Sequence, residues 1–293
     1  MSVINRGFCG LTLQFAPSEL AYYGTATALS KARYYFAATT VGDYALFGGG
    51  LGSDRVYSSA VDAYDTSLTR TTATELSRAR YNLVATAVGD YALFGGGYDG
   101  NSEGTNFVDA YNTSLTYTKA PSLRDTRRQL CAATVGNYAL LGGGLGQYNS
   151  NTVDAYDTSL TRKTATSLSA NHQYGTTTSV GNYALFGGGN VSDVVDAYDT
   201  SLTRTTATEL SEAKLNLAAT TVGDYALFGG GSLGSGFASI VDVYDTSLTR
   251  TTATSLSKKR ANLAATTVGD YALFGGGRLG SGLASIVDVY AAE

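Results

Sequence analysis

The chain contains 293 residues, of which 43% are hydrophobic and 15% charged, so it can bury a sizeable core. Its 36 Gly and 22 Tyr, with only 2 Pro and no Trp, indicate β-structure, and its net charge of -4 argues against nucleic acid as a partner. No apolar run approaches the roughly 18 residues of a membrane-spanning helix, and no secretory signal is evident at the start, so we expect a cytoplasmic protein without a membrane partner.

Residues 1–20 fit no repeat and form an extension to which the sequence assigns no role, whereas residues 21–293 consist of repeats. Two blocks recur there in constant order, with a period of about 46 residues, which predicts a repeat architecture. The block YALFGGG, once YALLGGG, begins at Tyr44, Tyr91, Tyr138, Tyr183, Tyr225 and Tyr271. The block VDAY or VDVY ends at Tyr64, Tyr111, Tyr156, Tyr198, Tyr244 and Tyr290.

The first complete repeat predicts four short β-strands in chain order. Residues 36–41 (FAATTV) lead through a Gly-Asp hairpin turn into residues 44–48 (YALFG). The VDAY block at residues 61–64 is the third strand, and an Asx-type turn that begins at Asp65 leads into a Thr-rich fourth strand at residues 69–76. Six such repeats predict an all-β, six-bladed β-propeller with four antiparallel strands per blade.

The sequence also predicts how the ring closes. It ends just after the third strand of the sixth repeat. Residues 22–36 align with residues 69–83, so residues 22–29 match a fourth strand that precedes the first repeat. We expect this N-terminal outer strand to complete the last blade and to leave no unpaired sheet edge.

These repeats resemble the kelch repeat. The resemblance rests on the paired glycines that end the second strand and on the tyrosine of the third, and it covers nearly the whole chain. The chain departs from the family at the start of the fourth strand, where kelch repeats usually carry a tryptophan and this sequence has Thr71, Thr118, Thr164, Thr205 and Thr251. The resemblance implies a propeller that binds protein partners through the loops of one face.

Sequence variation is confined to one face of the predicted disc. The turns between strands 1 and 2 and between strands 3 and 4 are almost invariant, whereas the loops between strands 2 and 3 and the links between blades differ among the repeats. We call the surface formed by these loops and links the variable face. It carries thirteen Lys and Arg against six Asp and Glu, a net charge of +7, which predicts an anionic or acidic partner.

Loops held by a rigid scaffold commonly carry binding residues, so the basic and aromatic side chains of the variable face form the candidate binding set. Its members are Arg33, Tyr34, Arg55, Arg80, Tyr81, Tyr98, Arg127, Arg128, Tyr148, His172, Tyr174, Lys214, Arg260 and Arg278.

The sequence offers little for catalysis or for a cofactor. His172 is the only histidine, which excludes a His-rich metal site, while Cys9 and Cys131 lack metal-ligand spacing. Cys131 lies on a predicted inner strand, where we expect a buried thiol. The six VDAY and VDVY aspartates occupy the same position in every blade, which indicates a structural role. We therefore predict no catalytic residue, no metal and no cofactor.

Together these features predict a non-catalytic, monomeric recognition module that binds a protein, a peptide or an acidic glycan on the variable face. Two alternatives stay open. The kelch resemblance also implies a sugar-acid mutarotase, which would need an axial pocket that holds both an Arg and a carboxylate. The near-identity of the copies is equally compatible with a repeat scaffold produced by recent duplication or engineering.

Overall fold

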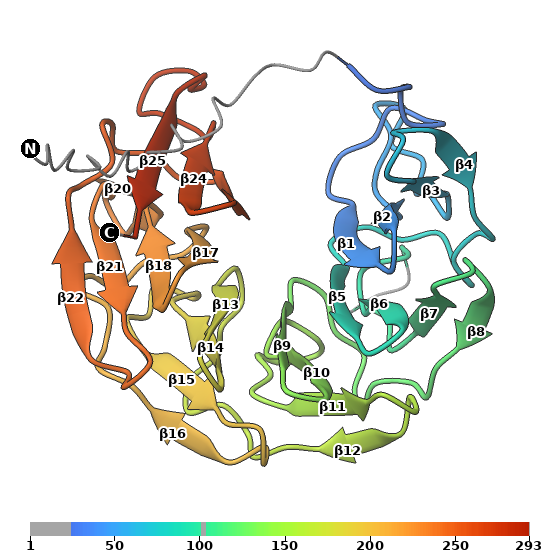
Figure 1. The fold of residues 1–293 in the computed structure, drawn as a ribbon, viewed down its shortest axis with the longest axis horizontal. Helices are drawn as coiled ribbons and strands as arrows, with labels where there is room; N and C mark the ends of the chain where they lie inside the picture. The colour runs from blue at the N-terminus through green and yellow to red at the C-terminus, as the bar shows by residue number, and fades with distance from the viewer. Residues whose placement is uncertain (1–24, 101–103, 293) are drawn as a thin grey trace, which may run out of the picture.

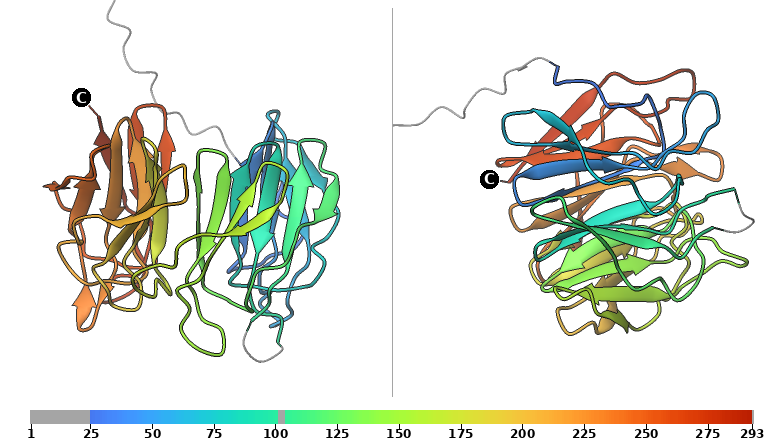
Figure 2. Two further views of the ribbon diagram at one scale, coloured as in Figure 1. Left: turned by 90° about the horizontal axis from the view of Figure 1, so that it is seen from below. Right: turned by 90° about the vertical axis from the view of Figure 1, so that its right-hand side faces the viewer.

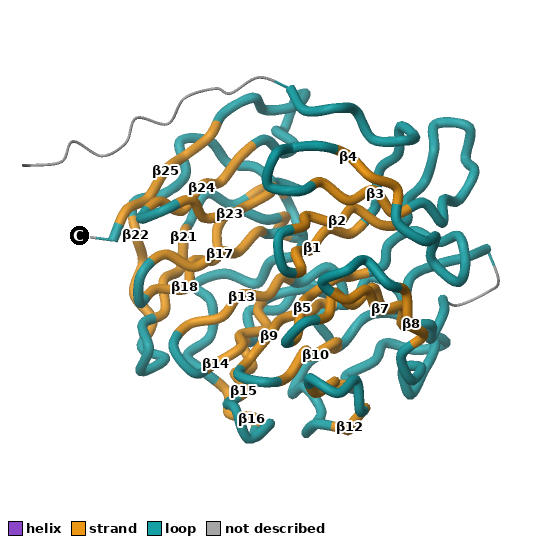
Figure 3. The backbone as a smooth tube through the Cα atoms, turned by 45° about the vertical axis from the view of Figure 1, so that its right-hand side comes forward, coloured by secondary structure: helices purple, strands orange, loops and turns teal. Residues whose placement is uncertain are grey.

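A computed structural model describes residues 25–100 and 104–292, whose main sheets are set around a central axis as six blades (Figure 1). Five blades have four antiparallel strands and the sixth has three, and within each blade the strands follow one another in chain order. The predicted six-bladed, all-β propeller is confirmed. The described residues form strands, turns and loops only (Figure 3), so they include no helix that could cross a membrane.

The first two strands of each blade form its inner part. The first strands are β1 (Ala37–Val41), β5 (Val84–Val88), β9 (Cys131–Val135), β13 (Thr176–Val180), β17 (Ala218–Val222) and β23 (Ala264–Val268). The second strands, which carry the YALFG or YALLG sequence, are β2 (Tyr44–Gly48), β6 (Tyr91–Gly95), β10 (Tyr138–Gly142), β14 (Tyr183–Gly187), β18 (Tyr225–Gly229) and β24 (Tyr271–Gly275). A two-residue turn joins each pair, and its glycine has a left-handed φ, 51° at Gly89, that suits a tight hairpin.

The third and fourth strands form the outer part. The third strands are β3 (Val61–Tyr64), β7 (Val108–Asn112), β11 (Val153–Asp157), β15 (Val195–Tyr198), β21 (Val241–Tyr244) and β25 (Val287–Ala291). The fourth strands are β4 (Arg70–Thr72), β8 (Tyr117–Lys119), β12 (Arg162–Thr164), β16 (Arg204–Thr206) and β22 (Arg250–Ala253). The expected Asx turn joins them: Asp65 Oδ1 accepts hydrogen bonds from the N–H groups of Ser67 (3.0 Å) and Thr69 (2.8 Å).

The antiparallel strand order gives the disc two faces (Figure 2). The invariant turns lie on one face, and the loops and links of the variable face lie on the other. One of these loops, in blade 5, folds into a small hairpin of β19 (Ser232–Leu233) and β20 (Gly236–Phe237).

The hydrophobic core is divided into five clusters, each between two neighbouring blades. Between blades 1 and 2, Phe94 packs against Gly48, where an added Cβ would come within 2.6 Å of the phenylalanine ring. Phe94 also meets Tyr111 edge to face, with ring centroids 5.9 Å apart. The Tyr111 hydroxyl donates to the Thr74 carbonyl, 2.7 Å away, in the segment that follows blade 1. Such Phe–Tyr pairs fill the space between blades in a chain without tryptophan.

The sixth blade has three strands in the described part of the chain. Residues 25–29 form no strand, and residues 22–24 lie outside the described residues. The described part of this segment lies against blade 1, where the Tyr64 hydroxyl donates to the Thr27 carbonyl (2.6 Å) and the Ser30 N–H to Asp62 (3.1 Å). The first of these bonds repeats the bond between Tyr111 and Thr74. The alignment of this segment with the later links is therefore right. The residues that align with β4 are 23–25, of which 23 and 24 lie outside the described residues, so the pairing of this segment with β25 stays a prediction.

Among the described residues, no strand joins blade 6 to blade 1, and Figure 1 shows a gap between β24 and β1. Gly275 takes the place that Gly48 has in blade 1, yet no described atom of blade 1 lies within 4 Å of the position its Cβ would occupy. On the outer edge of the same blade, Val287 is 56% exposed and Val289 is 54% exposed. The close fit between neighbouring blades is thus absent only here among the described residues.

Replacing Gly187 with alanine tests the fit between blades. The added Cβ would lie 2.7 Å from a ring carbon of Phe228 in blade 5, so the free energy of unfolding should fall by about 1–3 kcal/mol. Gly280→Ala is the control, because no atom lies within 4 Å of its added Cβ, and it should change this free energy by less than about 0.5 kcal/mol. Urea denaturation followed by circular dichroism measures both, and equal losses would contradict the packing described here.

Candidate functional site

Each link between blades carries an Arg, a Lys or a His at the same position, which we call the link cation although it is a histidine in blade 4, and its side chain is buried. In blade 2, Arg80 Nη2 lies 2.7 Å from Asp109 Oδ2 of β7, and neither side chain is exposed to solvent. The same nitrogen donates to the Phe94 carbonyl of β6, 3.0 Å away, so one side chain fixes the link to two strands. The other five blades have the equivalent pairs Arg33–Asp62, Arg127–Asp154, His172–Asp196, Lys214–Asp242 and Arg260–Asp288.

The aspartates of these pairs accept further hydrogen bonds. Besides Arg33, Asp62 accepts from Arg70 of β4 (2.9 Å) and from the Ser30 N–H (3.1 Å). Burial raises the pKa of Asp62, but these hydrogen bonds outweigh burial and hold the pKa below its usual value of 3.8. A similar balance lowers the pKa of Asp196 and of Asp288. The repeated aspartates make the same contact in every blade, which fits the structural role that their identical placement predicts.

The prediction that the paired link residues form part of the binding surface is wrong. Their side chains are enclosed by the blades and do not reach the surface of the variable face: Arg33, Arg80, Arg127, His172, Lys214 and Arg260. Without the five Lys and Arg among them, the variable face has eight cations against six carboxylates, a net charge of +2. The charge argument for an acidic partner is therefore lost.

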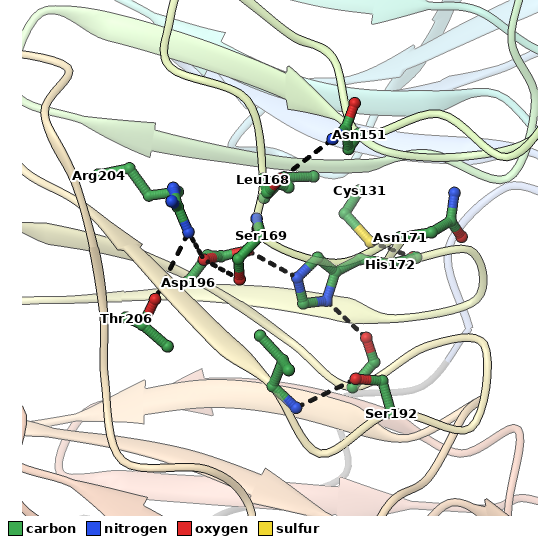
Figure 4. Close-up of polar contacts among 12 residues, drawn as sticks. Cys131, Asn151, Leu168, Ser169, Asn171, His172, Ser192, Asp196, Arg204 and Thr206 are labelled. Atoms are coloured by element: carbon green, nitrogen blue, oxygen red, sulfur yellow. Dashed lines mark hydrogen bonds and ion pairs between the residues drawn. The ribbon is translucent and has the colours of Figure 1, made fainter.

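His172 takes the place of the link arginine in blade 4 (Figure 4). Its Nε2 lies 3.1 Å from Asp196 Oδ2, and its Nδ1 lies 2.6 Å from the Gly188 carbonyl oxygen. Arg204 donates to the other oxygen of Asp196 at 2.8 Å. Beside them the Cys131 thiol contacts the His172 carbonyl at 3.3 Å, and burial raises the pKa of that thiol to about 12. The buried thiol is confirmed, and both imidazole nitrogens are engaged within the fold.

Blade 2 depends most on its link cation. Tyr117 faces Asp109 at the position where blades 1, 3, 4 and 5 place a second arginine. Arg80→Ala should therefore leave Asp109 buried without a cation and lower the free energy of unfolding by about 3–5 kcal/mol. Arg278→Ala, at an exposed position, should change it by less than about 0.5 kcal/mol. Chemical denaturation measures both variants. Similar losses of unfolding free energy in the two would refute the buried-pair account.

Stability should also fall in acid. The folded-state pKa values of Asp62, Asp196 and Asp288 lie below the ordinary value of 3.8, so these groups stabilise the fold fully above that value. Their contribution is lost as the pH falls through the folded-state pKa. The melting temperature should drop progressively below about pH 4, and Asp196→Asn should weaken this dependence. Thermal melts between about pH 7 and pH 2 check it, and a melting temperature that rises on acidification would contradict it.

A cavity of 860 Å³ lies at the axis on the variable face, and the links of all six blades line it. Its polar and aromatic lining residues are Tyr35, Tyr81, Asn82, Gln129, Tyr174, Asn216 and Asn262. The other lining residues are aliphatic or glycine, so no charged side chain lines the cavity in the described part of the chain. In the same part of the chain, no group of His, Cys, Asp and Glu is arranged to hold a metal ion.

One residue in each link, two positions after the buried cation, has a left-handed backbone with φ between 52° and 58°. We call these the rim residues: Tyr35, Asn82, Gln129, Tyr174, Asn216 and Asn262. Backbone N–H groups connect successive links, for example from Asn82 to the Tyr35 carbonyl (3.0 Å) and from Asn216 to the Tyr174 carbonyl (2.8 Å). Asparagine tolerates this backbone conformation, whereas tyrosine and glutamine adopt it at a cost. Strained residues that line a cavity indicate a functional site.

Five tyrosines form one cluster beside this cavity on blades 1 and 2, which we call the tyrosine cluster. The ring of Tyr81 lies at its centre, with centroids 6.1 Å from Tyr35, 5.3 Å from Tyr57 and 5.6 Å from Tyr98. Tyr34 packs against Tyr35, and these two are 47% and 59% exposed. Burial, together with Tyr57 and Tyr98, raises the pKa of Tyr81, so its hydroxyl stays protonated at neutral pH. The cluster offers uncharged aromatic surface next to the cavity.

The structure brings some of the remaining candidate residues together and leaves others apart. Tyr81 and Tyr174 line the axial cavity, and Tyr34 and Tyr98 belong to the tyrosine cluster beside it. The Arg128 guanidinium lies 5.0 Å from the Tyr98 ring centroid. Arg55 and Arg278 are exposed on other loops of the variable face and do not line the axial cavity. Tyr148, 76% exposed, lines a separate cavity of 510 Å³ in blade 3.

Sequence analysis missed the rim residues other than Tyr174. A signal for them exists, because every link has a cation at one position and every third strand has an aspartate at one position. Because the link residue and the aspartate both recur in every repeat, they indicate a structural pair. When the links are aligned on the first member of this pair, each rim residue lies two positions later. The side chains that vary at that position are the ones that line the cavity.

No protein-family model matches the sequence, and no curated protein matches it. A solved structure described as "Structure of YjhT" is similar to this chain, with a TM-score of 0.69 and 14% sequence identity. The match covers 90% of this chain and 96% of that one. At this identity the likeness supports the fold alone, and with the blade order described above it shows that the chain is a six-bladed β-propeller.

Proposed function

We propose that this propeller is a non-catalytic, kelch-like recognition module that binds its ligand at the mouth of the axial cavity. The observation that carries the proposal is the cavity of 860 Å³ lined by rim residues from all six links. Its size lies within the range of about 300–1,000 Å³ that small-molecule and cofactor sites occupy. The tyrosine cluster extends the same surface over blades 1 and 2.

Two features support binding rather than an incidental opening at the axis. Tyr35, Gln129 and Tyr174 have left-handed backbones at a cost of about 1–3 kcal/mol each, although asparagine serves at the same position in other blades. Gln129 is also oriented by its neighbours, since its Oε1 accepts from Gln173 at 2.6 Å and its Nε2 donates to the Tyr174 hydroxyl. These side chains are held in place before any ligand arrives, which lowers the entropic cost of binding.

The lining of the cavity supports recognition over the mutarotase alternative. Moving a proton on a sugar acid would need a carboxylate and an arginine inside the pocket. The link arginines that lie two positions before a rim residue are buried in the blades, where aspartates hold them, and no arginine lines the cavity among the described residues. Tyrosines and amides remain, and these groups bind and orient a ligand without exchanging protons near neutral pH.

Substitution of Tyr81 tests the proposed site. Wild type, Tyr81→Ala and Tyr148→Ala would be screened as fluorescently labelled full-length proteins on glycan and peptide arrays. Tyr148→Ala is the matched control, because it removes an exposed tyrosine that lines another cavity of the same face. We expect wild type and Tyr148→Ala to bind the same arrayed ligands. Tyr81→Ala should bind these ligands with an affinity at least about tenfold lower.

Thermal melts establish first that both variants are folded. Binding that Tyr81→Ala leaves intact, or a failure of wild type to bind any arrayed glycan or peptide, would overturn the proposed site.

A further inference from the structure

We infer that the ligand of the axial mouth is an uncharged saccharide. The inference rests on the proposed function and names the class of ligand for the same site. Three properties of the mouth lead to it: its aromatic surface, its amide side chains and its lack of charge.

The aromatic surface lies where a ring-shaped ligand would enter. Tyr35 and Tyr81 both line the cavity, and their rings are nearly parallel, with an angle of 27° between their planes. Tyr35 is 59% exposed, so its ring is available to a ligand. The apolar C–H face of a pyranose ring can pack against such an aromatic face, while the hydroxyl groups around its edge remain free for hydrogen bonds.

The amides supply partners for those hydroxyl groups. Asn82, Asn216 and Asn262 each bring a carbonyl acceptor and an NH₂ donor to the lining of the cavity, whereas the amide of Gln129 already bonds to Gln173 and Tyr174. Adjacent hydroxyl groups of a sugar are donors and acceptors at once, so an amide can satisfy both of its functions against a pair of them. This chemistry requires no charge on either side.

The backbone of the rim argues against an extended peptide. A peptide that adds a strand needs unpaired N–H and C=O groups. The rim N–H groups of Asn82, Gln129, Asn216 and Asn262 already donate to the neighbouring links at 2.8–3.0 Å. Recognition at the mouth therefore falls to side chains, which here are aromatic rings and amides.

The charge distribution argues against an acidic sugar. An anion that leaves water needs a cation to compensate for its lost hydration. Five of the Arg and Lys in the links are paired with aspartates inside the blades, and the cavity lining has no charged group among the described residues. Arg128 lies over the ring of Tyr98 at the edge of the tyrosine cluster, not in the cavity lining.

The test uses isothermal titration calorimetry on the full chain. The uncharged probes are tri- and tetrasaccharides of glucose, galactose, mannose and N-acetylglucosamine. The charged probes are tri- and tetrasaccharides that carry carboxylate groups. Each is titrated at about 0.05 M and about 0.5 M NaCl, because screening weakens only charged contacts. We expect at least one uncharged saccharide to bind, with an affinity that changes less than about twofold between the two salt concentrations.

Two variants at one position separate stacking from other effects. Tyr81→Ala should weaken binding of the uncharged saccharide at least about tenfold, whereas Tyr81→Phe keeps the ring and should bind within about twofold of wild type. Thermal melts confirm that both variants are folded.

The other outcomes distinguish the ligand class from the site. The inference would be overturned if only acidic saccharides bound, with a salt-dependent affinity, or if only peptides bound. The proposed site would still stand in that case if Tyr81→Ala abolished this binding. Saccharide binding that is insensitive to Tyr81→Ala, or no binding of any saccharide or peptide, would overturn both.

Discussion

The pair between a link cation and a third-strand aspartate determines the arrangement of everything at the axis. A carboxylate buried as deeply as Asp109 is costly unless a cation and hydrogen-bond donors surround it, so the cation has one possible place in each blade. Two residues after that cation, the chain reaches the rim. Arg80 thus positions Asn82, and the same relation holds in every blade. The interaction that secures the link also presents the side chain that lines the cavity.

This dependence explains which parts of the molecule the sequence could predict. The number of blades, the positions of their strands and the invariant turns follow from local patterns that recur six times. YALFG forms the same strand in each of its five copies, and YALLG forms it in blade 3. The structural role of Asp109 and its equivalents follows from the same repetition. These features are local, so one repeat contains the information for all of them.

The site could be predicted only in part, for two physical reasons. Arg80 lies in a link whose neighbouring residues vary, and residue type alone does not distinguish a solvated arginine from one that is buried against an aspartate of another strand. The contribution of Gln129 depends on the left-handed backbone of the rim, which is common for asparagine and rare for glutamine. Tyr34, Tyr81, Tyr98 and Tyr174 were found because exposed aromatic side chains on variable loops need no such information.

The mouth itself is not symmetric, although the blades nearly are. Tyrosines gather on blades 1 and 2, while blades 5 and 6 contribute Asn216 and Asn262. A ligand bound at the axis as proposed would meet more aromatic surface on one side and more amides on the other, which would give it a preferred orientation. Uniform repeats supply the frame, and a few positions per link supply the specificity, so a history of duplication and a role in recognition are compatible.

Among the described residues, blades 1 and 6 are each packed against only one neighbouring blade. In a closed ring every blade has two neighbours, and no blade can detach without breaking two interfaces. In an open one, each terminal blade is held by one interface, and stability becomes a sum along a line, as in linear repeat proteins. Unfolding should then begin by fraying from blades 1 and 6. Blades 3 and 4 contain the His172–Asp196 pair and the thiol of Cys131. Their backbone amides would be the last to lose protection against hydrogen exchange.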